Sequence, residues 1–277
     1  MRSTWLARSI GYGAFALIVL AVIIYLRLPS DFLERCIVST ITENRPDLLV
    51  TVTDAKPQFP PGVRLDHLVI RFLDLESASV EFERISVAAA ITKLLLGRLA
   101  FSLEARAYGG DIRGNLSFAD RFSGSGPLRA EMTFSEVSVG RCSYLKALSG
   151  RRVEGMLSGT LLYNGRVEDA VNGRGRLEIR LRDGSIGFLS PVLGFDRLDF
   201  SRADGEAALE NRILTVRTIR FTGRDFQGTL SGRVFLDRDF RKSRLDMEGT
   251  LTFAASNAGP QAVSLTGSVG DPVVQFM

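Results

Sequence analysis

Side chains that could carry out chemistry are few in this sequence, and they lie far apart. The single histidine, His67, follows Asp66 in a stretch that alternates like a β-strand. A Ser-His-Asp catalytic set would have to use this histidine, and no sequence typical of a nucleophile elbow is present. The carboxylates Glu81 and Glu83 stand on the polar side of a similar stretch, where solvation explains them. We therefore expect no catalytic residues and a protein that is not an enzyme.

Metal and cofactor sites are equally hard to assemble. One histidine and two distant cysteines, Cys36 and Cys142, do not provide a metal cluster. Gly173 and Gly175 lack the third glycine and the strand-to-helix context of a dinucleotide-binding loop, and no Walker loop occurs. We predict no cofactor and no metal. A disulfide would need cysteine Cα atoms within about 4.4–6.8 Å, which the sequence leaves open, and we favour two unpaired, partly buried thiols.

The charges exclude one class of partner. The formal net charge is +4, and the cations are spread along the chain and are nearly all arginine. No run of basic residues could follow a phosphate backbone, so we expect no nucleic-acid partner.

The elements that could position a site begin with an apolar N-terminal segment. Residues 9–26 carry no charge and lie between Arg8 and Arg27. As a helix they would be roughly 27 Å long, close to the ~30 Å hydrocarbon core of a bilayer. No small-x-small cleavage site follows, which argues against a signal peptide. We predict a cytoplasmic tail over residues 1–8 and a transmembrane anchor over residues 9–28, because more arginines precede the span than follow it directly.

A second helix is predicted directly after the anchor, over residues 30–45. Its apolar side chains recur at helical spacing, Asp31 and Glu34 fit a capping box, and Pro46 ends it. Such a juxtamembrane helix could lie near the membrane surface or pack on the next element. Packing is the role we expect.

From residue 47 to residue 277 the apolar period changes from 3.6 to 2. Leu177, Ile179 and Leu181, for example, alternate with charged residues, as in a strand with one buried face. About a dozen such stretches, separated by turn sequences, predict antiparallel strands. The fold class is therefore mainly β: a curved or folded antiparallel sheet with few short helices. Those short helices are expected over residues 85–97, 139–150 and 187–194.

Glycines four residues apart recur within these strands and fall on one face. They leave that face thin, which suits bends, bulges or the close approach of another sheet or an acyl chain. We favour sheet curvature as their main role. The pairs are Gly110 and Gly114, Gly155 and Gly159, and Gly228 and Gly232.

An apolar face of this length has two possible outcomes. It is buried on itself as a closed β-core, or it forms a groove that holds an apolar ligand such as phospholipid acyl chains. The sequence leaves both open. The candidate lipid-facing residues are Leu177, Ile179, Leu181, Leu230, Val234, Leu245, Met247, Leu251 and Phe253.

Several short motifs follow the anchor in a defined order. Residues 59–65 (FPPGVRL) form a Pro-Gly turn that leads into a strand, and residues 94–101 (LLLGRLAF) lead into residues 108–114 (YGGDIRG). Residues 265–276 (LTGSVGDPVVQF) form a closing strand. In this order, and with the anchor, they resemble the type II secretion system protein N (GspN) family, which is related to the AsmA-like proteins. The resemblance covers nearly the whole chain.

The resemblance implies a bacterial inner-membrane protein with a cytoplasmic N-terminus, a periplasmic bulk over residues 47–277 and no catalytic residues. Membership would make it a non-enzymatic component of the type II secretion system, docking other secretion components through its sheet edges or its arginine-rich outer face. Solubility explains those arginines equally well. The AsmA relationship implies instead a curved β-groove that binds or transfers envelope lipids. The outer-face arginines are Arg174, Arg176, Arg180 and Arg182.

Overall fold

The computed structural model describes residues 29–75, 78–119, 126–166, 169–192, 195–224, 226–254 and 259–276. The predicted tail over residues 1–8 and the predicted anchor over residues 9–28 lie outside the described residues. Within the described part of the chain, no helix is long and apolar enough to span a bilayer.

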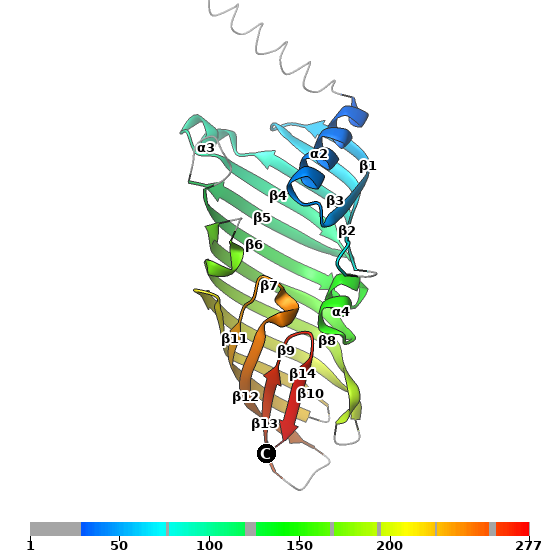
Figure 1. Ribbon diagram of the computed structural model, residues 1–277, viewed down its shortest axis with the longest axis vertical. Coiled ribbons are helices and arrows are strands. Elements are labelled where there is room, and N and C mark those ends of the chain that lie inside the picture. The colour runs from blue at the N-terminus through cyan, green and yellow to red at the C-terminus, as the bar shows by residue number, and fades with distance from the viewer. Residues whose placement is uncertain are drawn as a thin grey trace, which may run out of the picture.

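The described chain forms one antiparallel sheet of 14 strands, in which each strand pairs with the next one along the sequence (Figure 1). The sheet is not closed, because the described residues of β1 and β14 do not pair with each other. This confirms the predicted mainly β class with few short helices. The strands are β1 (Leu48–Gln58), β2 (Gly62–Phe72), β3 (Ser79–Ala89), β4 (Ala100–Ala107), β5 (Gly110–Phe118), β6 (Pro127–Ser138), β7 (Val153–Arg166), β8 (Arg174–Val192), β9 (Phe195–Glu210), β10 (Ile213–Gly223), β11 (Phe226–Phe235), β12 (Arg244–Phe253), β13 (Gln261–Gly267) and β14 (Pro272–Phe276).

The sheet curls about its long axis into a trough with one concave side (Figure 1). Strand twist accumulates from neighbour to neighbour, and register shifts such as that between Phe134 and Val137 of β6 increase it locally. Glycines thin the concave face. Gly249 of β12 pairs with Leu230 of β11, and a Cβ at Gly249 would lie 2.7 Å from Leu230 Cδ2. Glycine is needed there because the leucine occupies the space that a side chain would take.

Helix α2 (Ser30–Asn44) covers the concave side of the first strands (Figure 1). Its apolar side chains Leu33, Ile37 and Ile41 pack against a buried cluster that contains Val50 and Val52 of β1. The helix and the packing role predicted for this segment are confirmed.

The predicted capping box at the start of α2 is wrong. The helix begins at Ser30 with Pro29 as its N-cap, and no side chain caps it. Asp31 therefore lies inside the first turn rather than at the cap. The Pro29 carbonyl accepts the amides of Phe32 and Leu33, at 3.1 and 3.3 Å, and closes the first turn from the backbone alone.

The remaining helices are short and lie in the connections between strands. The helix predicted over residues 139–150 is confirmed by η1 and α4. The one predicted over residues 85–97 is too long, because residues 85–89 belong to β3 and pair with β4. The one predicted over residues 187–194 is wrong, because β8 continues to Val192 in a hairpin with β9 that uses its backbone groups. The elements are α3 (Ile91–Leu95), α4 (Ser143–Ser149), η1 (Val139–Arg141), η2 (Ala170–Asn172) and η3 (Phe240–Lys242).

Candidate functional site

The nine residues predicted to line a lipid groove all lie on the concave face. Cross-strand pairing carries this face from strand to strand, because alternate side chains of a strand point to the same side. Leu157 of β7 pairs with Leu181 of β8, which pairs with Ala203 of β9. Leu157 packs in the cluster that also contains Phe82, and Phe82 packs in the cluster beneath α2. The face covered by α2 is thus continuous with the face that carries the nine residues.

These nine residues do not form one site. Seven of them pack in two clusters of buried side chains toward the C-terminal end, where Val234 and Phe253 are only 6 % and 7 % exposed. Leu177 and Ile179 belong to neither cluster. The apolar face is therefore closed on itself at most of the predicted groove positions. Of these seven, four are buried (Val234, Met247, Leu251 and Phe253) and three are partly buried (Leu181, Leu230 and Leu245).

A segment that reaches across the concave side joins the two rims at the closed end. It comprises residues 139–152, and we call it the bridge. The bridge connects β6 to β7 on one rim of the trough, whereas η3 and the β13–β14 turn lie on the opposite rim. Helix α4 of the bridge nevertheless contacts η3. Arg151 Nη2 donates to the carbonyl of Pro272 at 3.2 Å. The two rims meet at this point (Figure 1).

The bridge is fixed on its own rim by polar contacts. Ser143 Oγ accepts the amide of Ser79 at 2.9 Å and lies 3.0 Å from its carbonyl. Cys142 of the bridge lies in one buried cluster with Tyr108, whose hydroxyl accepts the amide of Glu81 at 2.9 Å and whose pKa is raised by burial. The ring of Tyr144 lies 4.4 Å from a phenylalanine ring of β2. These contacts hold the bridge firmly against the first strands.

Behind the bridge, the closed end contains a small cavity of about 150 Å³. Its wall is apolar except for Arg151, whose pKa is lowered by burial. Ile186 of β8 and Phe200 of β9 line it together with Val274 and Phe276 of β14. An empty apolar cavity of this size admits a small ring or a few carbons. It does not hold a whole lipid.

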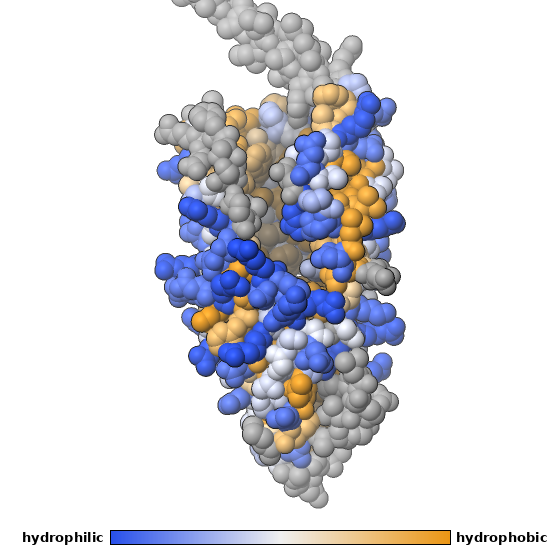
Figure 2. All heavy atoms as spheres, in the orientation of Figure 1, coloured by the Kyte–Doolittle hydropathy of each residue, from blue (hydrophilic) through white to orange (hydrophobic). Residues whose placement is uncertain are grey.

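Between α2 and the bridge, the concave face is covered by neither. Among the half-buried apolar side chains that the five adjacent strands β4–β8 present there, we single out six near the middle of the strands, which belong to none of the buried clusters of the described chain. Figure 2 shows this part of the molecule as a hollow with an apolar floor beside α2. We call these six residues the open groove. They are Leu103, Leu116, Met132, Leu161, Leu177 and Ile179.

The outer face carries ion pairs between neighbouring strands. Of the arginines predicted to dock a partner, Arg174 pairs with Glu210, Arg180 with Asp204 and Arg182 with Glu136, at 3.2, 3.1 and 2.7 Å. Three of the four arginines thus already have carboxylate partners within the sheet. This favours the solubility interpretation over charge pairing with another subunit.

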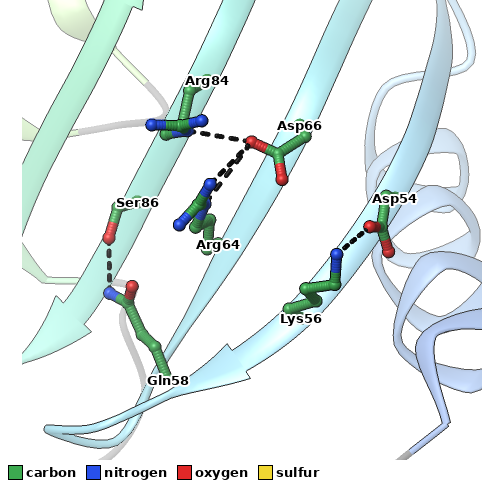
Figure 3. A network of polar contacts seen from close by, with 7 residues as sticks. All are labelled: Asp54, Lys56, Gln58, Arg64, Asp66, Arg84 and Ser86. Carbon is green, nitrogen blue, oxygen red and sulfur yellow. Dashed lines mark hydrogen bonds and ion pairs between the residues drawn. The ribbon is translucent and has the colours of Figure 1, made fainter.

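The same arrangement occurs at the N-terminal end of the sheet (Figure 3). Arg84 Nε donates to Asp66 Oδ1 at 2.9 Å, and Arg64 lies on the same oxygen. The hydrogen bond from Arg84 is the main reason that the pKa of Asp66 is lowered. Lys56 and Asp54, which both lie on β1, form a further ion pair.

The residues that could have done chemistry are not assembled. His67 is exposed and has a φ of 53° where the face pattern of β2 changes register, a position that histidine tolerates well. Cys36 is exposed on α2 and Cys142 is buried. Both are free thiols, as predicted, but the burial predicted for both is found only for Cys142. No group of three or more metal-ligating side chains occurs in the described chain.

Sequence reasoning missed the bridge. Ser79 and Ser143 are 64 residues apart and neither stands in a local motif, so no short pattern marks their contact.

Comparisons with protein-family models, with curated proteins and with solved structures find no match.

Proposed function

We propose that the open groove binds the alkyl chains of envelope lipids and that the protein is a non-enzymatic, membrane-anchored lipid-binding protein with an AsmA-like β-groove. One observation carries this proposal. Five adjacent strands present half-buried apolar side chains on the concave side, and no described element packs on them. A contiguous apolar surface of this kind, within a polar rim, is typical of a ligand-binding groove.

The dimensions of the open groove suit a lipid chain. Five strands at about 4.8 Å per spacing extend over roughly 19 Å. One leaflet of a bilayer has an apolar thickness of about 15 Å, half of the ~30 Å core. The bridge closes the groove toward the C-terminal end. A ligand would therefore enter from the end at which α2 lies.

Two neighbouring leucines allow a direct test. Leu161 of β7 points into the open groove, whereas Leu162 points outward and is 47 % exposed. A photo-crosslinking residue at position 161 of the full chain, reconstituted in phospholipid nanodiscs, should form lipid adducts. The same residue at position 162 should form few, although its side chain is the more exposed. Equal adduct yields at the two positions would overturn the proposal.

The proposal includes the cellular location. The anchor over residues 9–28 would hold the protein in a bacterial inner membrane, with a cytoplasmic N-terminus and residues 47–277 in the periplasm. The uncharged run and the resemblance to GspN and AsmA-like proteins support this. Cys36 offers a test because it is exposed and lies just after the anchor. A membrane-impermeant maleimide should label it once the outer membrane is permeabilised, and labelling only after lysis would place α2 in the cytoplasm.

A second candidate function is a structural component of the type II secretion system. One observation favours it: among the described strands β1 pairs only with β2, so the 11 residues of this edge strand could accept a strand from another subunit. A photo-crosslinking residue at Leu49 of β1 should then give adducts with secretion components reconstituted in the same membrane. A matched residue at Val273 of β14 would report contacts that are not specific to this edge. Adducts at neither position would remove this candidate.

A further inference from the structure

Large apolar side chains are exposed at the end of the sheet where α2 begins. The connection between β1 and β2 exposes Phe59 by 69 %. The connection between β3 and β4 exposes Leu94 by 47 % and Leu96 by 75 %, and the first turn of α2 exposes Phe32 by 51 %. We call these four residues the end patch. They are among the most exposed large apolar side chains of the described residues.

The two connections are neighbours in space. Both follow odd-numbered strands, so they lie on the same rim of the meander. The amide of Ala89, at the end of β3, donates to the carbonyl of Pro61 at 2.7 Å, and Ala90 then accepts the amides of the first turn of α3. Phe59 and α3 are thereby attached to one another. Figure 1 places α3 and the start of α2 at the same end of the molecule, on either side of the trough.

The charge around Leu94 and Leu96 has one sign, whereas Asp31 and Glu34 flank Phe32 at the start of α2. Residues 87–103 contain Lys93 and Arg98 and no acidic residue. Both cations are exposed, and neither has an ion-pair partner among the described residues. This differs from the ladder of matched pairs on the outer face. Exposed apolar side chains next to unpaired cations suit the headgroup region of an anionic bilayer, where the apolar groups are buried and the cations meet phosphate.

The chain itself indicates which partner meets this end. The described chain starts at Pro29, directly before α2, and the 18 residues 9–26 that precede it carry no charge. We propose that the end patch rests on the surface of the membrane that holds the anchor, with Phe59, Leu94 and Leu96 inserted among the headgroups. This contact sets the trough upright on the bilayer, with its bridged end farthest away. It rests on the membrane anchor of the proposed function but does not depend on the groove binding lipid, and the two contacts are tested separately.

The test compares exposed apolar positions at the two ends. A photo-crosslinking residue is placed at position 59, 96, 162 or 273 of the full chain in nanodiscs of phosphatidylcholine and phosphatidylglycerol. Leu162 on the outer face and Val273 of β14 are 47 % and 43 % exposed, so they serve as matched controls. Lipid adducts are expected at positions 59 and 96, and few at 162 and 273. Similar yields at all four positions would overturn the proposal.

Charge reversal gives a second measurement. Lys93→Glu and Arg98→Glu should each lower the adduct yield at position 96 by about fivefold in nanodiscs with phosphatidylglycerol, and much less in phosphatidylcholine alone. An unchanged yield would exclude the electrostatic part of the contact. Adducts at Leu161 report the open groove independently. Lipid adducts at position 96 but not at position 161 would contradict groove binding. Lipid adducts at position 161 but not at position 96 would contradict contact of the end patch with the membrane.

Discussion

The middle of the sheet and its C-terminal end have the same sequence pattern, but the apolar face is covered only at the C-terminal end. Strands β4–β8 and strands β9–β14 both alternate apolar and polar residues, with glycines on the concave face. In the C-terminal strands Phe200 and Val263 are each 3 % exposed, because β14 curls back toward β8. In the middle strands Leu161 and Leu177 stay half-buried. Alternation therefore determines which face is apolar, and curvature determines whether that face is covered.

The largest expected effect comes from placing a charge in each region. Leu251→Arg would bury a guanidinium at a position that is 8 % exposed. It should lower the free energy of unfolding by several kcal/mol, so that no cooperative unfolding transition remains above ambient temperature. Leu161→Arg in the open groove should leave the fold intact, because the long side chain can reach solvent along the groove. Thermal unfolding followed by circular dichroism distinguishes the two. Equal losses would show that the groove is a core like the closed end.

Truncating one apolar side chain in each region should give a smaller difference in the free energy of unfolding. Phe200→Ala removes a ring packed in the closed cluster and should lower the free energy of unfolding by about 3–5 kcal/mol. Leu177→Ala removes a half-buried side chain and should cost about 1 kcal/mol. Denaturant titration of the two variants measures both values. A cost for Leu177→Ala close to that for Phe200→Ala would mean that another part of the protein covers the groove.

The comparison also explains what the sequence could reveal. The strands and the shared face of the nine candidate residues follow from local alternation, so they could be predicted. Which residues are covered depends on contacts over long sequence separations. The hydrogen bond from Arg151 to Pro272 joins residues 121 positions apart, and no local pattern encodes it. For the same reason Leu181 and Leu251, predicted together with Leu177, are found in the closed cluster. The local errors, such as the helix expected over residues 187–194, arose where pairing in a hairpin overrode a short apolar run.

The bridge can be weakened at a single hydrogen bond. Arg151→Met removes the hydrogen bond to the Pro272 carbonyl but keeps most of the side-chain volume. Because burial of the guanidinium is itself unfavourable, the net loss should be only about 1 kcal/mol. The loss should be local, with faster amide exchange in β13 and β14 and unchanged exchange in β1 and β2. Exchange that stays unchanged in β14 would show that the curl of the sheet alone holds the end closed.

Ion pairs on the outer face should contribute alike near the two ends of the sheet, and acid tests this. The pKa of Asp66 near the N-terminal end is lowered mainly by Arg84, and that of Asp204 in β9 mainly by Arg202. A carboxyl group whose folded pKa lies below its unfolded value of 3.8 binds fewer protons in the folded state. Its stabilisation is therefore complete above about pH 4 and is lost as the pH falls through the folded pKa.

Since both pairs are solvent-screened, Asp66→Asn and Asp204→Asn should each cost less than about 1 kcal/mol at pH 7 and almost nothing near pH 2. Denaturant titrations at the two pH values measure this difference. Similar small values for the two variants would show that closure of the C-terminal end does not depend on the outer ion pairs. A much larger loss in the free energy of unfolding for Asp204→Asn would show that closure of the C-terminal end also depends on the outer ion pairs. Asp204 lies at that end, where the sheet bends around a closed core.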